Sequence, residues 1–170
     1  MKISIYIAVS TNGLISNTRN VPDWLSPEYG QGFYTICQKT KAVIMGKTSY
    51  DILAPDYLPL KAGGKTIVLT TKKGLTSLNS TVVFTEESPA EIIKDLQNEG
   101  YTEAVIIGGA MAISTFLNSA LVDEIYFVVE PVLFAGGLPL MQGVKIDRKL
   151  RLIDVTKLND NTVQLHYQIC

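Results

Sequence analysis

Hydrophobic runs and helical patterns alternate along most of this 170-residue chain. Short runs of β-favouring aliphatic residues predict strands that are buried on both faces. Two-sided burial is typical of a parallel sheet whose strands are connected by helices. The predicted strands cover residues 3–9, 42–45, 66–69, 82–84, 105–107 and 124–130.

Start signals for helices stand between these strands. Ser26-Pro27-Glu28 combines a capping serine, a proline at the first helical position and an acid at the positive end of a helix, which we expect to run to about Lys39. Ser88-Pro89-Ala90-Glu91 is a capping box and predicts a helix that ends at Gly100. Two further helices are predicted, one over residues 47–54 that Pro55 stops and one that follows residue 109.

The C-terminal part of the chain changes character. Two strands are predicted over residues 150–158 and 162–169, and Asn159-Asp160-Asn161 between them is typical of a hairpin. Residues 16–23 and 131–143 are predicted to be loops, and His166 is expected to face solvent from its strand. The predicted fold is therefore α/β, with one domain over residues 1–170: a three-layer sandwich of a mixed, mostly parallel sheet with helices on both faces and an antiparallel C-terminal hairpin.

Composition and charge narrow the classes of function. A hydrophobic content of 46% with 18% charged residues indicates a folded globular protein. The net charge of −1 favours no nucleic-acid or membrane-surface partner, and no apolar run approaches the ~20 residues of a membrane span. Cys37 and Cys170 have no metal-ligand spacing, so we expect no metal site and a reduced, cytoplasmic protein.

Groups that bind phosphate follow three of the predicted strands. After the second strand, Gly46-Lys47-Thr48 offers backbone N–H groups, an ammonium and a hydroxyl at a helix start. After the third, Thr70-Thr71-Lys72-Lys73 offers hydroxyls and two ammonium groups suited to a phosphate monoester. After the fifth, Gly108-Gly109 offers a bare backbone cradle. Because ligands of an open α/β sheet bind at the carboxyl ends of its strands, the three segments together favour a dinucleotide with an extra phosphate, NADPH rather than NADH.

Each of these segments alone also fits an ordinary turn from a strand into a helix. No G-x-G-x-x-G follows the first strand, which argues against a standard Rossmann site. Gly46-Lys47-Thr48 lacks the upstream glycine of a P-loop, so a nucleoside triphosphatase is also disfavoured. Only the combination of the three segments supports cofactor binding.

Several segments that follow one another along nearly the whole chain carry a family resemblance. They are Ile7 to Ile15, Trp24 to Glu28, Val43 to Tyr50, Ile67 to Thr70, Ile107 to Ala110, and Val122 to Ile125 with Glu130 to Leu133 and Gly137 to Leu140. In these segments the chain resembles the dihydrofolate reductase-like superfamily. The similarity is closest to the branch that contains the reductase domain of the bifunctional riboflavin-biosynthesis deaminase-reductase.

The resemblance implies a dihydrofolate reductase-like sandwich and an NADPH-dependent reductase. By motif, Ala8 and Ile15 would meet the nicotinamide through their backbones. Gly46-Lys47-Thr48 would hold the pyrophosphate and ribose, and Thr70-Thr71-Lys72 the adenosine 2′-phosphate. Gly108-Gly109-Ala110-Met111 would cradle the pyrophosphate, with a cis peptide bond between the two glycines.

Hydride transfer must be accompanied by a proton, and the resemblance places the donor of that proton on the first predicted helix. Dihydrofolate reductases deliver it from one carboxylate there, and Glu28 is the candidate catalytic residue in this chain. Counting back from Phe33 places Tyr29 at the position of the acid, so this assignment needs a shift of one residue. The alternative role of Glu28 is that of an acid that only stabilises the first helical turn.

The resemblance leaves three functions open. The sequences of the segments Trp24 to Glu28 and Glu130 to Leu140 favour the riboflavin-type branch. This branch acts on a ribosylated pyrimidine phosphate, as in 5-amino-6-(5-phosphoribosylamino)uracil reductase. Dihydrofolate reductase is the first alternative, and an NADPH-binding protein of this fold without turnover is the second. The expected partner is a small-molecule substrate, and the resemblance also suggests a homodimer through the apolar segment from Pro131 to Met141.

Overall fold

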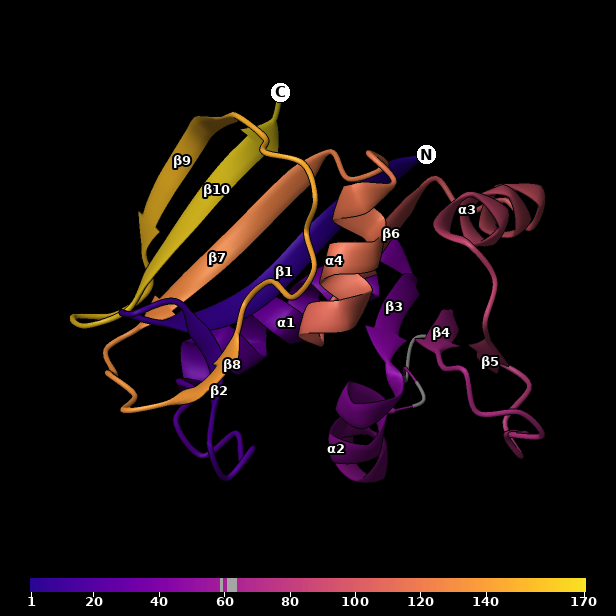
Figure 1. The fold of residues 1–170 in the computed structure, drawn as a ribbon, viewed down its shortest axis with the longest axis horizontal. Coiled ribbons are helices and arrows are strands. Elements are labelled where there is room, and N and C mark those ends of the chain that lie inside the picture. Colours follow the sequence, from indigo (N-terminus) through magenta and orange to yellow (C-terminus); the bar gives the residue numbers. More distant parts are fainter. Residues whose placement is uncertain (59, 61–63) are drawn as a thin grey trace.

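The computed structural model describes residues 1–58, 60 and 64–170. They form three layers, with a twisted central sheet between two layers of helices (Figure 1). The sheet has the strand order β5-β4-β3-β6-β1-β7-β10-β9. Its strands are β1 (Lys2–Ser10), β3 (Ala42–Gly46), β4 (Lys65–Leu69), β5 (Val82–Thr85), β6 (Glu103–Ile106), β7 (Glu124–Glu130), β9 (Leu150–Lys157) and β10 (Val163–Ile169).

The directions of the strands confirm the predicted sheet. β1 pairs in parallel with β6 and β7, β3 with β4 and β6, and β4 with β5. β10 then pairs antiparallel with both β7 and β9, as expected for the terminal hairpin. The α/β sandwich with a mostly parallel sheet is therefore the observed fold.

Alternation along the strands explains why both faces of the sheet are covered. On β1, Ile3, Ile5 and Ile7 belong to one apolar cluster, which includes residues of α3 (Pro89–Asn98) and α4 (Ala110–Asn118). Tyr6 and Ala8, which point to the other face of β1, belong to a second cluster with residues of α1 (Pro27–Thr40) and α2 (Lys47–Tyr57). Period-two alternation thus places one helical layer on each face.

The helix starts follow the predicted chemistry. The hydroxyl of Ser26 accepts the backbone N–H of Tyr29 at the start of α1, and Ser88 forms the predicted capping box with Glu91 at the start of α3. The predicted end of α2 at residue 54 is wrong, because the helix continues past Pro55 to Tyr57. A proline removes one backbone donor from a helix, and here the helix ends two residues after that loss rather than at it.

A small second sheet was not predicted. β2 (Leu14–Asn17) and β8 (Gly137–Pro139) pair antiparallel inside segments that the sequence assigned to loops in part. Gly137 has a φ of +156°, and a Cβ at this position would lie 1.9 Å from the carbonyl oxygen of Ser16. The close approach of the two strands therefore requires glycine at this position.

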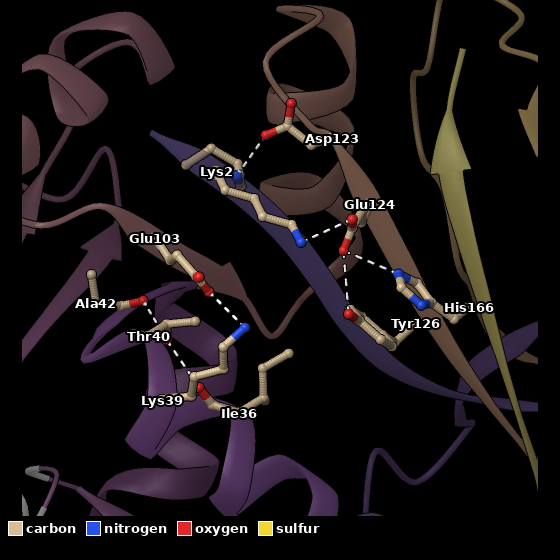
Figure 2. Close-up of polar contacts among 11 residues, drawn as sticks. Lys2, Ile36, Lys39, Thr40, Ala42, Glu103, Asp123, Glu124, Tyr126 and His166 are labelled. Carbon is tan, nitrogen blue, oxygen red and sulfur yellow. Dashed lines mark hydrogen bonds and ion pairs between the residues drawn. The ribbon is translucent and has the colours of Figure 1, made fainter. Parts of the chain in front are cut away.

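His166 does not face solvent as predicted. Its side chain is only 16% exposed, its ring stacks on Tyr126 with centroids 4.0 Å apart, and its Nε2 lies 3.0 Å from Oε2 of Glu124 (Figure 2). His166 stands directly opposite Tyr126 of β7, so the Tyr126 ring and the Glu124 carboxylate cover it. Burial raises the pKa of the Glu124 carboxyl, but the hydrogen bonds and charges of Lys2 and His166 outweigh it and leave that pKa below its usual range.

Candidate functional site

A cleft of about 1130 Å³ lies where parallel strands of the sheet end. It is bordered by Gly46 at the end of β3, Thr70 after β4 and Gly108 after β6, and these three strands are neighbours in the sheet. The backbone N–H of Gly46 donates to the carbonyl oxygen of Gly108 over 2.8 Å. The fold thus brings together the three segments that the sequence singled out.

Two helices begin at this cleft without a side-chain cap. Gly46 is the N-cap residue of α2 and Gly109 that of α4, and neither start has a capping side chain. A Cβ on Gly46 would lie 3.5 Å from the backbone nitrogen of Gly109, so the two starts almost touch. The Gly108–Gly109 peptide bond is cis, as the resemblance implied. Two adjacent helix starts present backbone N–H groups and partial positive charge to an anion.

Side chains at the start of α2 add charge and hydroxyls to the cleft. Lys47, Thr48 and Ser49 border it, as do Ala110 and Met111 at the start of α4. The Lys47 ammonium lies 2.5 and 2.7 Å from the two carboxylate oxygens of Asp51, one turn further along α2. Its charge is therefore partly balanced within the helix.

The β4–β5 end of the cleft carries groups of mixed charge. Thr70 and Thr71 border the cleft as predicted, whereas Lys72 is not among the bordering residues. Glu86 and Glu87, which follow β5, border it instead. These two carboxylates were not predicted, although they follow a predicted strand closely, which is the same signal that picked out the threonines.

An aromatic wall from α1 and the loop before it closes another side of the cleft. Trp24, Tyr29 and Phe33 border the cleft, together with Ala8 of β1 and Ile15 of β2. Burial is the main factor that raises the pKa of Tyr29 well above its ordinary value, and the nearby Tyr6 adds to it. A hydrogen bond with the backbone of Ala8 lowers it in part. The phenol of Tyr29 therefore keeps its proton at neutral pH.

Glu28 lies outside this cleft. Its Oε2 accepts a hydrogen bond of 2.9 Å from Nδ2 of Asn159 in the β9–β10 turn. It borders an adjoining, open recess of about 530 Å³, which shares Trp24, Leu25 and Ser26 with the cleft. The structure thus places the side chain of the predicted catalytic acid at this recess, and its neighbour Tyr29 in the cleft.

A buried carboxylate that was not predicted stands behind the aromatic wall. Glu130, at the end of β7, is 1% exposed. Its Oε1 accepts the backbone N–H and the hydroxyl of Ser26, at 3.0 and 2.7 Å, and its Oε2 lies 3.1 Å from the hydroxyl of Thr162. The sequence held one signal for its burial: Glu130 comes two residues after Val128, so the two side chains lie on the same face of β7, and Val128 is fully buried.

No described helix has both the length and the apolar character needed to cross a membrane. Among the residues that the structure describes, no group of three or more histidine, cysteine, aspartate or glutamate side chains is placed to hold a metal ion.

Comparison with known proteins gives consistent matches over the whole chain. The model of the RibD C-terminal domain family matches residues 2–164. YwjB of Bacillus subtilis (strain 168) is 31% identical over 172 residues, which cover 98% of this chain and 97% of the relative.

Solved structures share the fold at lower identity. A candidate riboflavin biosynthesis protein from Shewanella sp. PV-4 has a TM-score of 0.83 at 22% identity, covering 100% of this chain and 99% of its own. A diaminohydroxyphosphoribosylaminopyrimidine deaminase/5-amino-6-(5-phosphoribosylamino)uracil reductase from Thermotoga maritima has a TM-score of 0.80 at 17% identity, covering 99% of this chain and 56% of its own.

Proposed function

Because this chain belongs to the RibD C-terminal domain family, we propose that it is an NADPH-dependent reductase of a small pyrimidine- or pterin-type molecule. The observation that carries the proposal is the convergence of Lys47, Thr71 and the Gly108–Gly109 pair on one cleft. The reductase named for the Thermotoga maritima match gives the first reaction type to test, the reduction of a ribosylated aminouracil.

The residues of the cleft fit a phosphorylated dinucleotide. The uncapped starts of α2 and α4 would hold the pyrophosphate with their backbone N–H groups, and the ammonium of Lys47 would add charge. The hydroxyls of Thr70 and Thr71 would hold the adenosine 2′-phosphate, with Lys72 close along the chain. When bound, the reduced nicotinamide supplies a hydride.

The backbones of Ala8 and Ile15, which border the cleft from β1 and β2, would position the nicotinamide ring. Reduction of a C=O or C=N bond also requires a proton at the heteroatom. Among the residues of α1 that border the cleft, Tyr29 is the one whose side chain carries an O–H group. We propose that Tyr29 donates this proton to the substrate in place of Glu28, whose carboxylate accepts a hydrogen bond from Asn159.

Trp24 provides a direct test of cofactor binding, because it is the one tryptophan of the sequence and it borders the cleft. We expect NADPH to quench its fluorescence, and Lys47→Met to weaken that binding. Lys72→Met should weaken NADPH more than NADH if Lys72 reaches the 2′-phosphate. If neither NADPH nor NADH quenched the fluorescence of Trp24, the proposal would be wrong.

Turnover is then measured as loss of the absorbance of reduced nicotinamide. Oxidation of NADPH with 5-amino-6-(ribosylamino)uracil or its 5-phosphate supports the riboflavin-type reaction, and oxidation with dihydrofolate supports a dihydrofolate reductase. Binding of NADPH without oxidation by any pterin or pyrimidine supports a cofactor-binding protein that lacks turnover.

The proposal includes a cytoplasmic location, with which the two free cysteines, Cys37 and Cys170, agree. It also includes a homodimer through the segment from Pro131 to Met141, in which Leu133 is exposed. Sedimentation velocity of the protein and of Leu133→Asp tests the dimer, and a monomeric wild-type protein would exclude it.

A further inference from the structure

The cleft has an apolar part that the proposed cofactor contacts do not use. This part lies along the start of α1, the loop before it and the second half of α2. The bordering residues there are Val21, Pro22, Trp24, Leu25, Ile52 and Leu53. In a reductase this is the space left for the substrate.

Ring contacts hold the aromatic wall of this space in place. The ring of Trp24 meets that of Phe134 edge-on, with centroids 5.2 Å apart. Tyr29 is stacked on Tyr6 at 5.3 Å and is tilted against Phe33 at 6.4 Å. Aromatic side chains fixed in this way present a rigid, flat, apolar surface, which suits a flat ring system.

The helix that starts at this wall differs from the other two helices of the cleft. α2 and α4 begin at glycines without a side-chain cap, so their N–H groups can take a phosphate. α1 begins at Ser26, whose backbone N–H and hydroxyl both donate to the buried carboxylate of Glu130. The positive end of α1 therefore already holds an anion that belongs to the protein.

A second anion next to that carboxylate would be repelled. Two like charges in a medium of low dielectric constant cost more than they do in water, and Glu130 is almost completely shielded from solvent. The one lysine that borders the cleft among the described residues, Lys47, is bound to Asp51 at the cofactor side.

We propose that the substrate side of this cleft takes an uncharged, flat pyrimidine-type compound and discriminates against its phosphorylated form. This inference rests on the proposed reductase function and narrows its substrate. Phosphate groups are directed to the uncapped starts of α2 and α4, which the cofactor occupies. The apolar and aromatic wall at α1 receives the uncharged ring.

The test compares two ligands that differ only in a phosphate. The protein is first saturated with NADP⁺, and binding of 5-amino-6-(ribosylamino)uracil and of its 5-phosphate is then measured by calorimetry. We expect the unphosphorylated compound to bind at least about tenfold more tightly. Equal or tighter binding of the phosphate, or no binding of either compound to the NADP⁺-loaded protein, overturns the inference.

A matched pair of variants tests the position of the substrate. Ile52 borders the cleft, is 37% exposed and belongs to α2, so it tolerates a long side chain. Ile52→Met, of similar length without charge, is the control for the change in packing at this position. Relative to Ile52→Met, Ile52→Lys should shift the ratio of the two affinities toward the phosphorylated compound by at least about fivefold. Unchanged affinities in Ile52→Lys contradict the inference.

The two proposals fail in different ways. If neither NADP⁺ nor NADPH binds, the reductase function itself is wrong. If the cofactor binds and the phosphorylated compound is preferred, only the selection of an uncharged substrate is wrong.

Discussion

Ser26 gives both its backbone N–H and its hydroxyl to one carboxylate oxygen of Glu130, over 3.0 and 2.7 Å. The same hydroxyl accepts the backbone N–H of Tyr29 over 3.1 Å, so one side chain caps α1 and satisfies a buried charge. The contact joins the start of α1 to the end of β7, 104 residues away. The aromatic wall of the cleft is therefore positioned by a charge that lies behind it.

Replacement of this serine should destabilise the protein strongly. In Ser26→Ala the helix loses its cap, which costs about 1 kcal/mol, and the buried carboxylate loses a donor, which costs about 1–3 kcal/mol more. Chemical denaturation should show this loss in the free energy of unfolding. Ser88→Ala is the matched control, because Ser88 caps α3 with the exposed Glu91, and its loss should be clearly smaller. Equal losses in the two variants would mean that the buried charge contributes nothing.

The small sheet at the cleft should depend on one glycine. Gly137→Ala places a Cβ against the carbonyl oxygen of Ser16, so we expect it to separate β2 from β8, to lower the free energy of unfolding by about 1–3 kcal/mol and to weaken NADPH binding through Ile15. Gly136→Ala is the control, since its Cβ would make an ordinary contact of 3.7 Å with Thr18. Trp24 quenching and thermal unfolding measure the two effects, and similar results for both variants would contradict the expectation.

The parts of the fold that were predicted correctly are those set by local patterns. The capping box from Ser88 to Glu91, the hairpin around Asn159 and the buried strands all depend on residues close together in the sequence. The β2–β8 sheet joins strands of four and three residues that are about 120 positions apart, which no local pattern can register.

In the candidate site too, some features could be predicted from the sequence and others depend on the folded chain. The three segments that border the cleft could be found because the carboxyl ends of neighbouring parallel strands meet at one edge of a sheet. The choice between Glu28 and Tyr29 depends on the rotation of α1 about its axis, and one residue corresponds to about 100° of that rotation. Burial of Glu130 required the distant donors Ser26 and Thr162, and only the folded chain brings these together.

Alkaline pH should destabilise the protein through groups that burial keeps protonated. Burial raises the pKa of Cys37 to about 12 from an ordinary value of 9.0, and it likewise raises the pKa of Tyr126 to about 12. Below pH 9 both folded and unfolded thiols hold their protons, so the stability is fully present there. Above it the unfolded state loses its proton first, so the free energy of unfolding should fall between about pH 9 and pH 12.

Urea denaturation over this pH range measures the effect. Cys37→Ala should show a smaller decline than the wild-type protein, whereas replacement of the exposed Cys170 should leave the decline unchanged. An identical pH dependence in Cys37→Ala would show that the thiol does not contribute.

The neighbouring residues Glu28 and Tyr29 give opposite expectations for catalysis. Tyr29 borders the cleft with a protonated hydroxyl beside Ala8, so Tyr29→Phe should lower kcat by at least about 100-fold. The ring that stacks on Tyr6 remains in this variant, and quenching of Trp24 by NADPH should therefore be unchanged. Glu28→Gln should leave kcat within about twofold, because its side chain bonds Asn159 outside the cleft and touches no reacting atom. If Glu28→Gln abolished turnover while Tyr29→Phe kept it, the proton would come from the carboxylate, and the first turn of α1 would have to rotate toward the cleft when substrate binds.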